Sequence, residues 1–336
     1  MDPTIAWYRT SLDPDLLTNL NKRSNVKGTL QAVGHLSCMI ATGVVVIICA
    51  SNGSWTWLVG ALFLHGTVCA FTINGVHELA HNTVFRTRWL NTAFGYVYAF
   101  IGWHNHFAFW GSHTEHHKHT LHPPYDLEVV QPEVFTIRGY FFQALINLPW
   151  LRDVPKLHWQ YATGQFNNEW DQHCFPDKNP AGRRPVIWWS RILLSGHVLI
   201  LFAAMATGQW IIPIVFSLAP AYGAWLFFLC NNTQHCGLMD NVNDFRLCAR
   251  TIDLNPVLRF FYWQMNYHIE HHMYAAVPCY NLHNLHKALV SDLPPTPKGL
   301  LQVWIEINEI MQRQRTDPRY RYAQPLPLRR DSRHSL

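Results

Sequence analysis

The sequence predicts an all-α integral membrane protein with four transmembrane helices, arranged as two hairpins under a cytoplasmic helical cap. Three observations lead to this prediction. Only 14% of the 336 residues are charged, whereas soluble domains carry about 25%. Four apolar stretches approach the length needed to cross a bilayer, and short polar turns join them in pairs. Histidine-rich motifs lie next to these stretches, so a polar layer must adjoin the membrane.

The four expected spans are broken by turns and prolines in a regular way. They cover residues 33–50, 55–76, 190–206 and 210–230. Residues 51–54 (Ser-Asn-Gly-Ser) form a turn signal within the first pair, and residues 207–209 (Thr-Gly-Gln) do the same within the second. The last span contains Pro213 and Pro220, which a spanning helix tolerates better than a soluble helix does.

The rest of the chain is expected to lie outside the bilayer. Residues 1–32 form a cytoplasmic lead-in, residues 33–290 the membrane domain, and residues 291–336 a cytoplasmic C-terminal helix and tail. Within the membrane domain, residues 90–109 are expected to form a helix in the membrane interface or a re-entrant segment, and residues 137–151 another interface helix. The N-terminus has no early apolar run, so no cleavable signal peptide is expected. The final residues, around 329–332, are expected to be disordered.

The distribution of basic residues predicts the orientation. The two connecting turns contain no Lys or Arg, so essentially all 26 basic residues lie on the opposite side. That side is expected to be cytoplasmic, which places every histidine motif on the cytoplasmic face of a bacterial inner membrane or the endoplasmic reticulum. The eight cysteines form no C-x-x-C pair, so we expect no disulfide framework.

Four groups of histidines are the candidate chemistry. The third motif, residues 268–272, has the spacing His-x-x-His-His, and the second motif, residues 113–117, repeats it. The first motif, residues 77–81, is an i, i+4 pair, and His235 follows the last span with Asn231 one helical turn before it. On a helix these spacings place imidazoles on one face. The nine candidate ligands, enough for two metal ions, are His77, His81, His113, His116, His117, His235, His268, His271 and His272.

The ligand type indicates iron rather than zinc. Zinc normally takes four ligands, structural zinc favours cysteine, and no cysteine stands at ligand spacing here. Neutral imidazoles suit two iron ions of higher coordination number that keep room for oxygen or water. Two ferrous ions in such a shell keep a net charge of about +4 beside the membrane. A site of this kind is placed to attack a C–H bond of a lipid-like substrate, with dioxygen as co-substrate.

The order and spacing of these motifs resemble the membrane fatty acid desaturase and hydroxylase superfamily, over roughly residues 33–290. The resemblance implies a di-iron centre held by the nine histidines, with Asn231 holding one iron through a water. It also implies electrons from a ferredoxin or a cytochrome b5-like protein. We see no haem, flavin or nicotinamide fingerprint, so this donor is expected to be a separate partner. The first motif has three residues between its histidines, as in sphingolipid desaturases, bacterial acyl-lipid desaturases and alkane hydroxylases, whereas many acyl-CoA desaturases have four.

Three functions stay open at this point. The first is an oxygen-dependent fatty acyl lipid desaturase that introduces a C=C bond with two electrons from the redox partner. The alternative uses the same di-iron site as a hydroxylase or epoxygenase of a lipid or hydrophobic metabolite. The third is a metal transporter or sensor, which the motifs disfavour because they lie at span ends rather than within spans. The substrate, its carrier, the regiochemistry and the oligomeric state are left open.

Other polar residues have competing interpretations. Glu78, Glu115 and Glu270 lie within the motifs, and each is either solvated or orients a histidine N–H. The remaining histidines are expected to make ordinary contacts: His104, His106, His119 and His122 near the second motif, His35, His65 and His197 within spans, and His283 and His286 on a surface helix.

Overall fold

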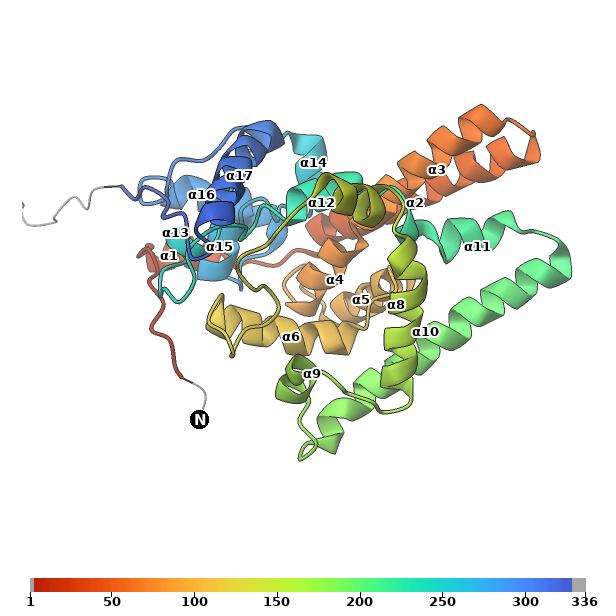
Figure 1. Cartoon of the computed structure of the whole chain (residues 1–336), viewed down its shortest axis with the longest axis horizontal. Helices are drawn as coiled ribbons and strands as arrows, with labels where there is room; N and C mark the ends of the chain where they lie inside the picture. The colour runs from red at the N-terminus through yellow and green to blue at the C-terminus, as the bar shows by residue number, and fades with distance from the viewer. Residues whose placement is uncertain (1–2, 328–336) are drawn as a thin grey trace, which may run out of the picture.

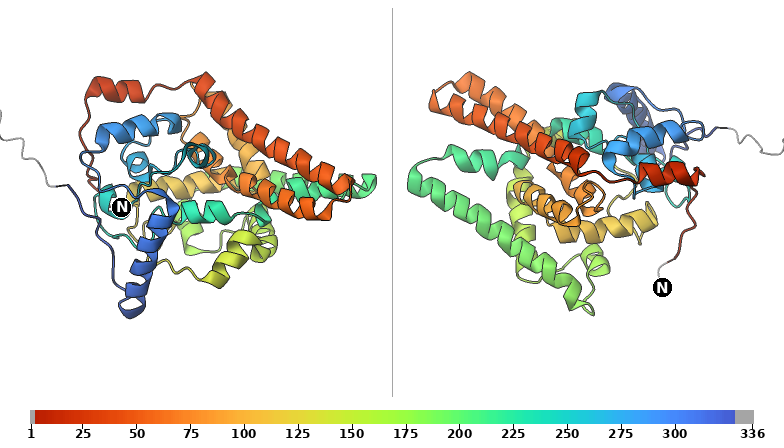
Figure 2. Two further views of the ribbon diagram at one scale, coloured as in Figure 1. Left: turned by 90° about the horizontal axis from the view of Figure 1, so that it is seen from above. Right: turned by 180° about the vertical axis from the view of Figure 1, so that it is seen from behind.

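The computed structural model describes residues 3–327, and this part of the chain contains helices and isolated β-bridges but no strand. Three helices are long and apolar enough to cross a membrane: Asn25–Ser51, Trp55–Ala80 and Pro180–Thr207. They extend from a body of shorter helices, and their far ends point to the same side in every view (Figures 1 and 2). The expected all-helical membrane architecture is confirmed at this level.

The first hairpin consists of α2 (Asn25–Ser51), α3 (Trp55–Ala70) and α4 (Thr72–Ala80). The Ser24 hydroxyl accepts a hydrogen bond from the Lys27 N–H and so starts α2 eight residues before the apolar stretch. At the far end the chain turns at Gly53, whose φ of 66° favours glycine. The helices α2 and α3 pack side by side, and α4 continues α3 beyond Phe71, which places the first motif at the end of the span.

The second hairpin differs from the prediction. Its first helix, α10 (Pro180–Thr207), ends at Gly208 in a left-handed conformation. The expected fourth span, residues 210–230, is not one helix but three short ones: α11 (Ile211–Phe216), η2 (Ala219–Ala221) and α12 (Trp225–Asn231). Pro220 cannot donate a backbone hydrogen bond, and Gly223 has a φ of 76°, so the helix breaks between them. The described residues therefore contain three candidate spans, and the fourth is not confirmed.

The two expected interface segments are also divided. Residues 90–109 form α5 (Arg88–Ile101) and the start of α6 (His106–His119), which carries the second motif. Residues 137–151 form α7 (Ile137–Tyr140), η1 (Phe141–Leu145) and the start of α8 (Leu148–Ala162), and α9 (Glu169–Cys174) follows. The Asn105 side chain caps α6 by accepting from the Phe107 and Ala108 N–H groups. This cap fixes where α6 begins and hence where its histidines point.

The remaining helices form the body opposite the hairpin ends. They are α1 (Pro14–Leu20), α13 (Phe245–Cys248), α14 (Pro256–Phe261), α15 (His268–Met273), η3 (Cys279–Asn281), α16 (Leu282–Leu289) and α17 (Gly299–Thr316). The C-terminal helix α17 packs Val303 and Ile307 against Cys230 and Cys236. The tail predicted to be disordered, residues 329–332, falls outside the described residues.

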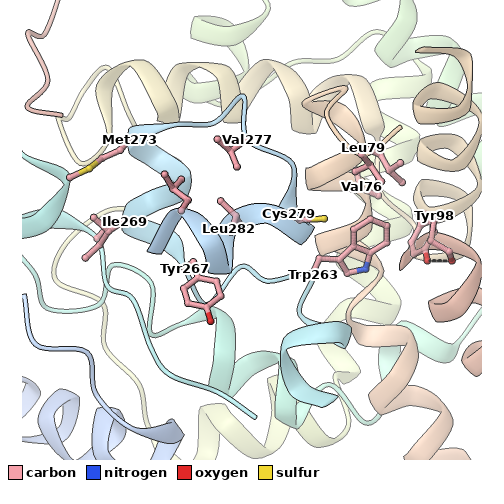
Figure 3. Close-up of a cluster of buried hydrophobic side chains, with 14 of the residues drawn as sticks. Val76, Leu79, Tyr98, Trp263, Tyr267, Ile269, Met273, Val277, Cys279 and Leu282 are labelled. Carbon is pink, nitrogen blue, oxygen red and sulfur yellow. Dashed lines mark hydrogen bonds between the residues drawn. The ribbon is translucent and has the colours of Figure 1, made fainter. Parts of the chain in front are cut away.

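A buried apolar cluster joins the first hairpin to this body. Val76 and Leu79 of α4 lie in the same cluster as Trp263 and Ile269, as Figure 3 shows. The Trp263 Nε1–H donates to His35 Nδ1 at 3.1 Å, which ties the segment before the third motif to α2. Large buried side chains of this kind contribute most of the packing energy. The cluster thus fixes the first and third motifs relative to each other.

Close packing between the first hairpin and the segment after η2 gives a testable prediction. A Cβ added at Gly66 of α3 would lie 2.0 Å from the Tyr222 carbonyl oxygen. We expect Gly66→Ala to destabilise the chain by about 1–3 kcal/mol, as overpacking does. Gly60, on the same helix, has no atom within 4 Å of such a Cβ, so Gly60→Ala should be neutral or slightly stabilising. Thermal unfolding in detergent measures both, and equal midpoints would contradict this packing.

Candidate metal centre

The nine predicted histidines converge as two groups of ring nitrogens, and within each group these nitrogens lie within 4.8 Å of one another. Seven of the nine are buried, and His81 and His117 are partly buried. The helices α4, α6 and α15 and the segment after α12 supply them. The five-histidine group is His77, His81, His113, His117 and His271, and the four-histidine group is His116, His235, His268 and His272.

Adjacent histidines in one motif belong to different groups. His116 lies in the four-histidine group and His117 in the other, and the same division separates His272 from His271. Consecutive helical residues point about 100° apart, so a His-His pair reaches two neighbouring points in space. The groups themselves touch, because the rings of His117 and His272 have centroids 4.5 Å apart. The repeated His-x-x-His-His spacing therefore places donors in two adjoining sites.

The nitrogen geometry fits a bound cation. His268 Nε2 lies 2.9 Å from His235 Nε2 and 3.1 Å from His272 Nε2, and a nitrogen with one proton or one lone pair cannot pair well with both. Nitrogens that bind one ion at about 2.1 Å and at right angles lie about 3.0 Å apart. In the other group, His271 Nε2 and His117 Nε2 are 3.1 Å apart.

Unsatisfied buried atoms support the same conclusion. The Nε2 atoms of His77, His81 and His113 are buried and have no hydrogen-bond partner. Leaving such an atom unpaired costs about 1–3 kcal/mol. A metal ion would satisfy all three, since each belongs to the five-histidine group. The residues present therefore fit metal ions in both groups.

Several of the opposite ring nitrogens are held by hydrogen bonds that orient the rings, whereas the buried Nδ1 atoms of His268 and His271 have no such partner. Two acidic residues do this for the second motif: His116 Nδ1 lies 2.8 Å from Asp126 Oδ2, and His113 Nδ1 lies 3.0 Å from Glu128 Oε1. His235 Nδ1 lies 2.7 Å from the Cys248 carbonyl oxygen. A proton held on Nδ1 leaves the Nε2 lone pair free to bind a metal.

Sequence reasoning missed Asp126 and Glu128. A signal was present, because both follow the second motif within eleven residues, just after Pro123-Pro124. The helix that carries the motif ends at His119, so the chain has room to fold back along it. Acidic residues placed to return toward a histidine motif were therefore candidates for holding its N–H groups.

The glutamates within the motifs were expected to be either solvated or hydrogen-bonded to a histidine N–H, and the structure contains both kinds. Glu78 is buried and lies 3.0 Å from His77 Nδ1, and so orients this candidate ligand; its distance of 3.7 Å from His271 Nδ1 is too long for a hydrogen bond. Glu270 is also buried; it accepts a 2.5 Å hydrogen bond from the Thr251 hydroxyl and is bonded to His286 Nδ1. Glu115 is partly exposed and pairs with Lys118 at 2.7 Å, so its solvated interpretation is the better one.

The other histidines of residues 3–327 belong to neither metal group. His35, His65 and His197 bond to backbone carbonyl oxygens of Val68, Val215 and Phe100 respectively, which agrees with the expected helix contacts. The prediction that His286 is only a surface feature is wrong, because its ring holds the buried Glu270 of the third motif. His104, His106, His119 and His122 also lie outside both groups.

Two cavities reach the histidines. The smaller, about 180 Å³, borders His77 and His113 of one group and His116, His235 and His268 of the other. Its other walls are mixed: Ile73, Phe109, Val129, Phe227 and Met265 form the apolar part, and Asn74, Glu128, Asn231 and Gln234 are polar. The larger, about 850 Å³, borders His81, His113, His117 and His272 and is covered by residues near the N-terminus, among them Trp7 and Arg9.

The electrostatics of the four-histidine group predict how the metal-free chain responds to pH. Burial and the neighbouring His116 lower the pKa of His235 to about 3, and burial with neighbouring imidazoles lowers the pKa of His268 and His272 well below the usual value. Below about pH 6.5 the unfolded chain then binds more protons than the folded chain. Burial also lowers the pKa of His116, but the neighbouring Asp126 outweighs burial, so the pKa of His116 is raised overall. This residue therefore stabilises the fold as the pH falls, opposite to the other three histidines.

We therefore expect metal-free protein to lose stability as the pH falls from about 7.5 to about 5.5. Each histidine with a lowered pKa contributes up to about 1.4 kcal/mol per pH unit once the pH is below 6.5. The thermal midpoint of chelator-treated protein, measured across this range, tests the expectation. The metal-loaded protein should be more stable at each pH, because a ligand that binds only the folded state stabilises it. A midpoint that does not depend on pH would contradict the burial of these imidazoles.

Comparisons with known proteins agree with this geometry. The family model described as "Fatty acid desaturase" matches residues 53–304. An sn-1 oleoyl-lipid 12-desaturase of Anabaena variabilis is 24% identical over 70% of this chain and 71% of its own length. A Delta(9) fatty acid conjugase-like enzyme of Dimorphotheca sinuata is 25% identical over 65% of this chain and 64% of its own length. Since the family match covers most of the chain and includes every histidine motif, this membrane oxidoreductase belongs to the fatty acid desaturase family.

Proposed function

We propose that this chain is an oxygen-dependent di-iron desaturase that introduces a C=C bond into the fatty acyl chain of a lipid. In this proposal each histidine group holds one ferrous ion, and Asn231 holds one of them through a water. The observation that carries the proposal is the adjoining pair of histidine groups on one small cavity, part of whose wall is apolar. Both relatives named above act on fatty acyl chains by their names, which supports the same substrate class.

The overall reaction balances as follows. One CH2–CH2 unit loses two hydrogens, and dioxygen takes up these together with two electrons and two protons to give two waters. The iron ions supply the activation of dioxygen that makes an unactivated C–H bond reactive. We infer that the electrons come from a separate ferredoxin or cytochrome b5-like protein.

The protein's own residues would bind, orient and exclude water. Ile73, Phe109, Phe227 and Met265 offer apolar walls on which an alkyl chain can lie beside the histidines. Glu78, Asp126 and Glu128 keep protons on the Nδ1 atoms of their histidines, so that the Nε2 lone pairs face inward. A site held this firmly keeps its geometry while electrons arrive.

The proposed topology follows from charge and arrangement. The turns at residues 51–54 and 207–209 lack basic residues, and the hairpin ends that carry them point to one side. We infer that this side is extracytoplasmic and that the histidine groups lie on the cytoplasmic face. Residues 33–290 would form the membrane domain, with residues 1–32 and 291–336 in the cytoplasm.

The test is product analysis after expression with an active redox partner. A desaturase product is lighter than its substrate by two hydrogens, whereas a hydroxylase or epoxygenase product contains one more oxygen. Mass spectrometry of total lipids separates these outcomes, and added oxygen would favour the second reaction at the same site. Metal analysis of the purified chain is the parallel control. Less than about two irons per chain after reconstitution, with no lipid product, would contradict the proposal.

A further inference from the structure

We propose that α8 lies in the membrane interface and forms a lateral entrance, through which an acyl chain passes from the bilayer to the metal cavity. The α8 entrance is defined by the side chains of Val154, Leu157, His158 and Tyr161. This inference rests on the proposed function, and it adds the form of the substrate: an acyl chain still carried by a bilayer lipid.

The outer side of α8 is apolar and exposed. Leu148 and Trp159, which are 54% and 63% exposed, lie on one stripe with Leu151 and Pro155, because these positions are spaced by three or four residues. The preceding segment continues this surface with Ile137, which is 80% exposed. Contiguous apolar surface of this kind marks a site of contact with a membrane or another protein.

Two observations favour the bilayer as the partner. First, α8 packs against α10, a candidate span whose own Trp188 and Ile192 are exposed, so the apolar surface continues onto a lipid-facing helix (Figure 1). Second, the exposed Arg152 and Lys156 lie on the same helix. Apolar and aromatic side chains beside basic ones are typical of a helix in the plane of the interface.

The inner side of α8 lines a second cavity, of about 320 Å³, with Val154, Leu157, His158 and Tyr161. Other elements add both apolar residues and the polar residues His104, Asn105, Ser112 and Asp171. The two polar residues that α8 contributes are already paired, since His158 Nε2 bonds the Trp103 carbonyl oxygen at 2.9 Å and the Tyr161 hydroxyl donates to Asp171 at 2.7 Å. Their remaining surface is carbon, which suits an alkyl chain better than a polar ligand.

Leu157 connects the two sides of α8. It is 37% exposed and also lines the inner cavity, so it lies at the edge between bilayer and protein interior. Tyr161 and Val154 lie about one turn away on either side of it. An acyl chain that slides past Leu157 leaves its headgroup outside, at the level of the basic residues of α8.

The inner cavity adjoins the metal cavity. Ile73 and Phe109 line both of them, so these apolar side chains separate the two spaces. Phe109 also stacks on His113, with ring centroids 5.1 Å apart. A chain that displaces Ile73 and Phe109 by rotation of their side chains therefore arrives beside a ligand of the five-histidine group. The larger cavity near the N-terminus would instead serve a substrate that arrives from water, and the experiment below separates these routes.

The experiment uses iron-loaded full-length protein in vesicles of phosphatidylcholine and phosphatidylglycerol. A small fraction of the lipid carries a photoactivatable group near the end of one acyl chain. After illumination, labelled peptides are mapped by mass spectrometry. For the unmodified chain we expect labels on α8 and on the peptides that contain Ile73 and Phe109.

Substitutions at the edge of the entrance should act in opposite directions. Leu157→Trp and Val154→Trp fill the entrance and should remove labelling at Phe109 while the outer stripe of α8 stays labelled. Leu157→Ala opens the entrance and should keep or increase the label at Phe109. Leu148→Trp, on the same helix but outside the cavity, is the matched control and should label as the unmodified chain does. Iron content and thermal midpoint identify any variant that has not folded.

The outcomes distinguish the entrance from the reaction. Unchanged labelling at Phe109 in both folded tryptophan variants, or equal loss in Leu148→Trp, would overturn the entrance. A second result would also overturn the entrance: conversion of a soluble acyl thioester, with no conversion of bilayer lipid and no label from bilayer lipid at Phe109. That result would favour entry through the N-terminal cavity. Labelling as expected, without any unsaturated product, would refute the proposed reaction and leave the entrance standing.

Discussion

Replacing His271 or His116 with alanine is expected to abolish product formation while the chain still inserts into the membrane. His271 supplies a nitrogen to the five-histidine group and His116 to the four-histidine group. Each variant removes one donor from a different proposed iron site, and neither residue lies in the apolar hairpins that anchor the chain. Product yield, iron per chain and the membrane-bound fraction are the three measurements.

A third histidine variant controls for the loss of an imidazole as such. His173 is partly exposed, belongs to neither group and stacks on Trp170. His173→Ala should keep both product yield and iron content. Turnover that persists in both His271→Ala and His116→Ala would remove the di-iron interpretation altogether. Loss of insertion in either variant would show that the histidine groups are needed for folding, and the iron content would then have to be compared on correctly inserted protein.

The nine candidate ligands were predictable because helical spacing is a local property. His268, His271 and His272 share a face on any helix that contains them, whatever the rest of the chain does. Which histidine of each adjacent pair joins which group was not predictable, since it depends on how α6 and α15 are rotated toward each other. That rotation is fixed by distant contacts, such as the packing of α4 against the segment around Trp263.

The errors have similar physical causes. Mean hydropathy identifies residues 210–230 as apolar, but it does not report the backbone conformations around Pro220 and Gly223 that break the helix. His286 was expected on a surface helix from its i, i+3 spacing to His283 just after Pro278. Its partner, Glu270, is buried and lies sixteen residues earlier in the chain, so local sequence spacing could not predict that the two side chains pair.

The second large effect is expected at Asp126, a positioning residue. This buried carboxylate accepts hydrogen bonds from three groups: His116 Nδ1 at 2.8 Å, the Leu121 N–H at 2.8 Å and the Glu128 N–H at 2.9 Å. The first two donors share Oδ2 and the third uses Oδ1. An asparagine side chain has only one oxygen, and its NH2 group would face at least one of these N–H donors, so it cannot accept all three hydrogen bonds. Asp126→Asn keeps the size of the side chain and removes its charge.

We expect Asp126→Asn to lower metal affinity or activity by about 10–100-fold, as the loss of a carboxylate behind a ligand histidine does. Asp126 raises the pKa of His116 although burial lowers it. The more basic imidazole donates its Nε2 electron pair to a metal ion more strongly. Without the carboxylate, one iron should leave more readily. Chelator-induced release, followed as iron remaining per chain, therefore measures the effect independently of turnover.

The matched control is Asp153→Asn, which removes an exposed carboxylate paired only with Arg152 and should change neither quantity. If Asp126→Asn lost thermal stability but kept its iron under chelation, the main role of Asp126 would be to stabilise the backbone at Leu121 rather than to orient His116. If it lost iron at unchanged thermal stability, the carboxylate would act through the imidazole. Iron loss is the expected result, because His116 Nδ1 has no other acceptor among the described residues. Some loss of thermal stability should accompany it, because the Leu121 and Glu128 N–H groups bond different oxygens of Asp126 and one buried amide oxygen cannot accept from both.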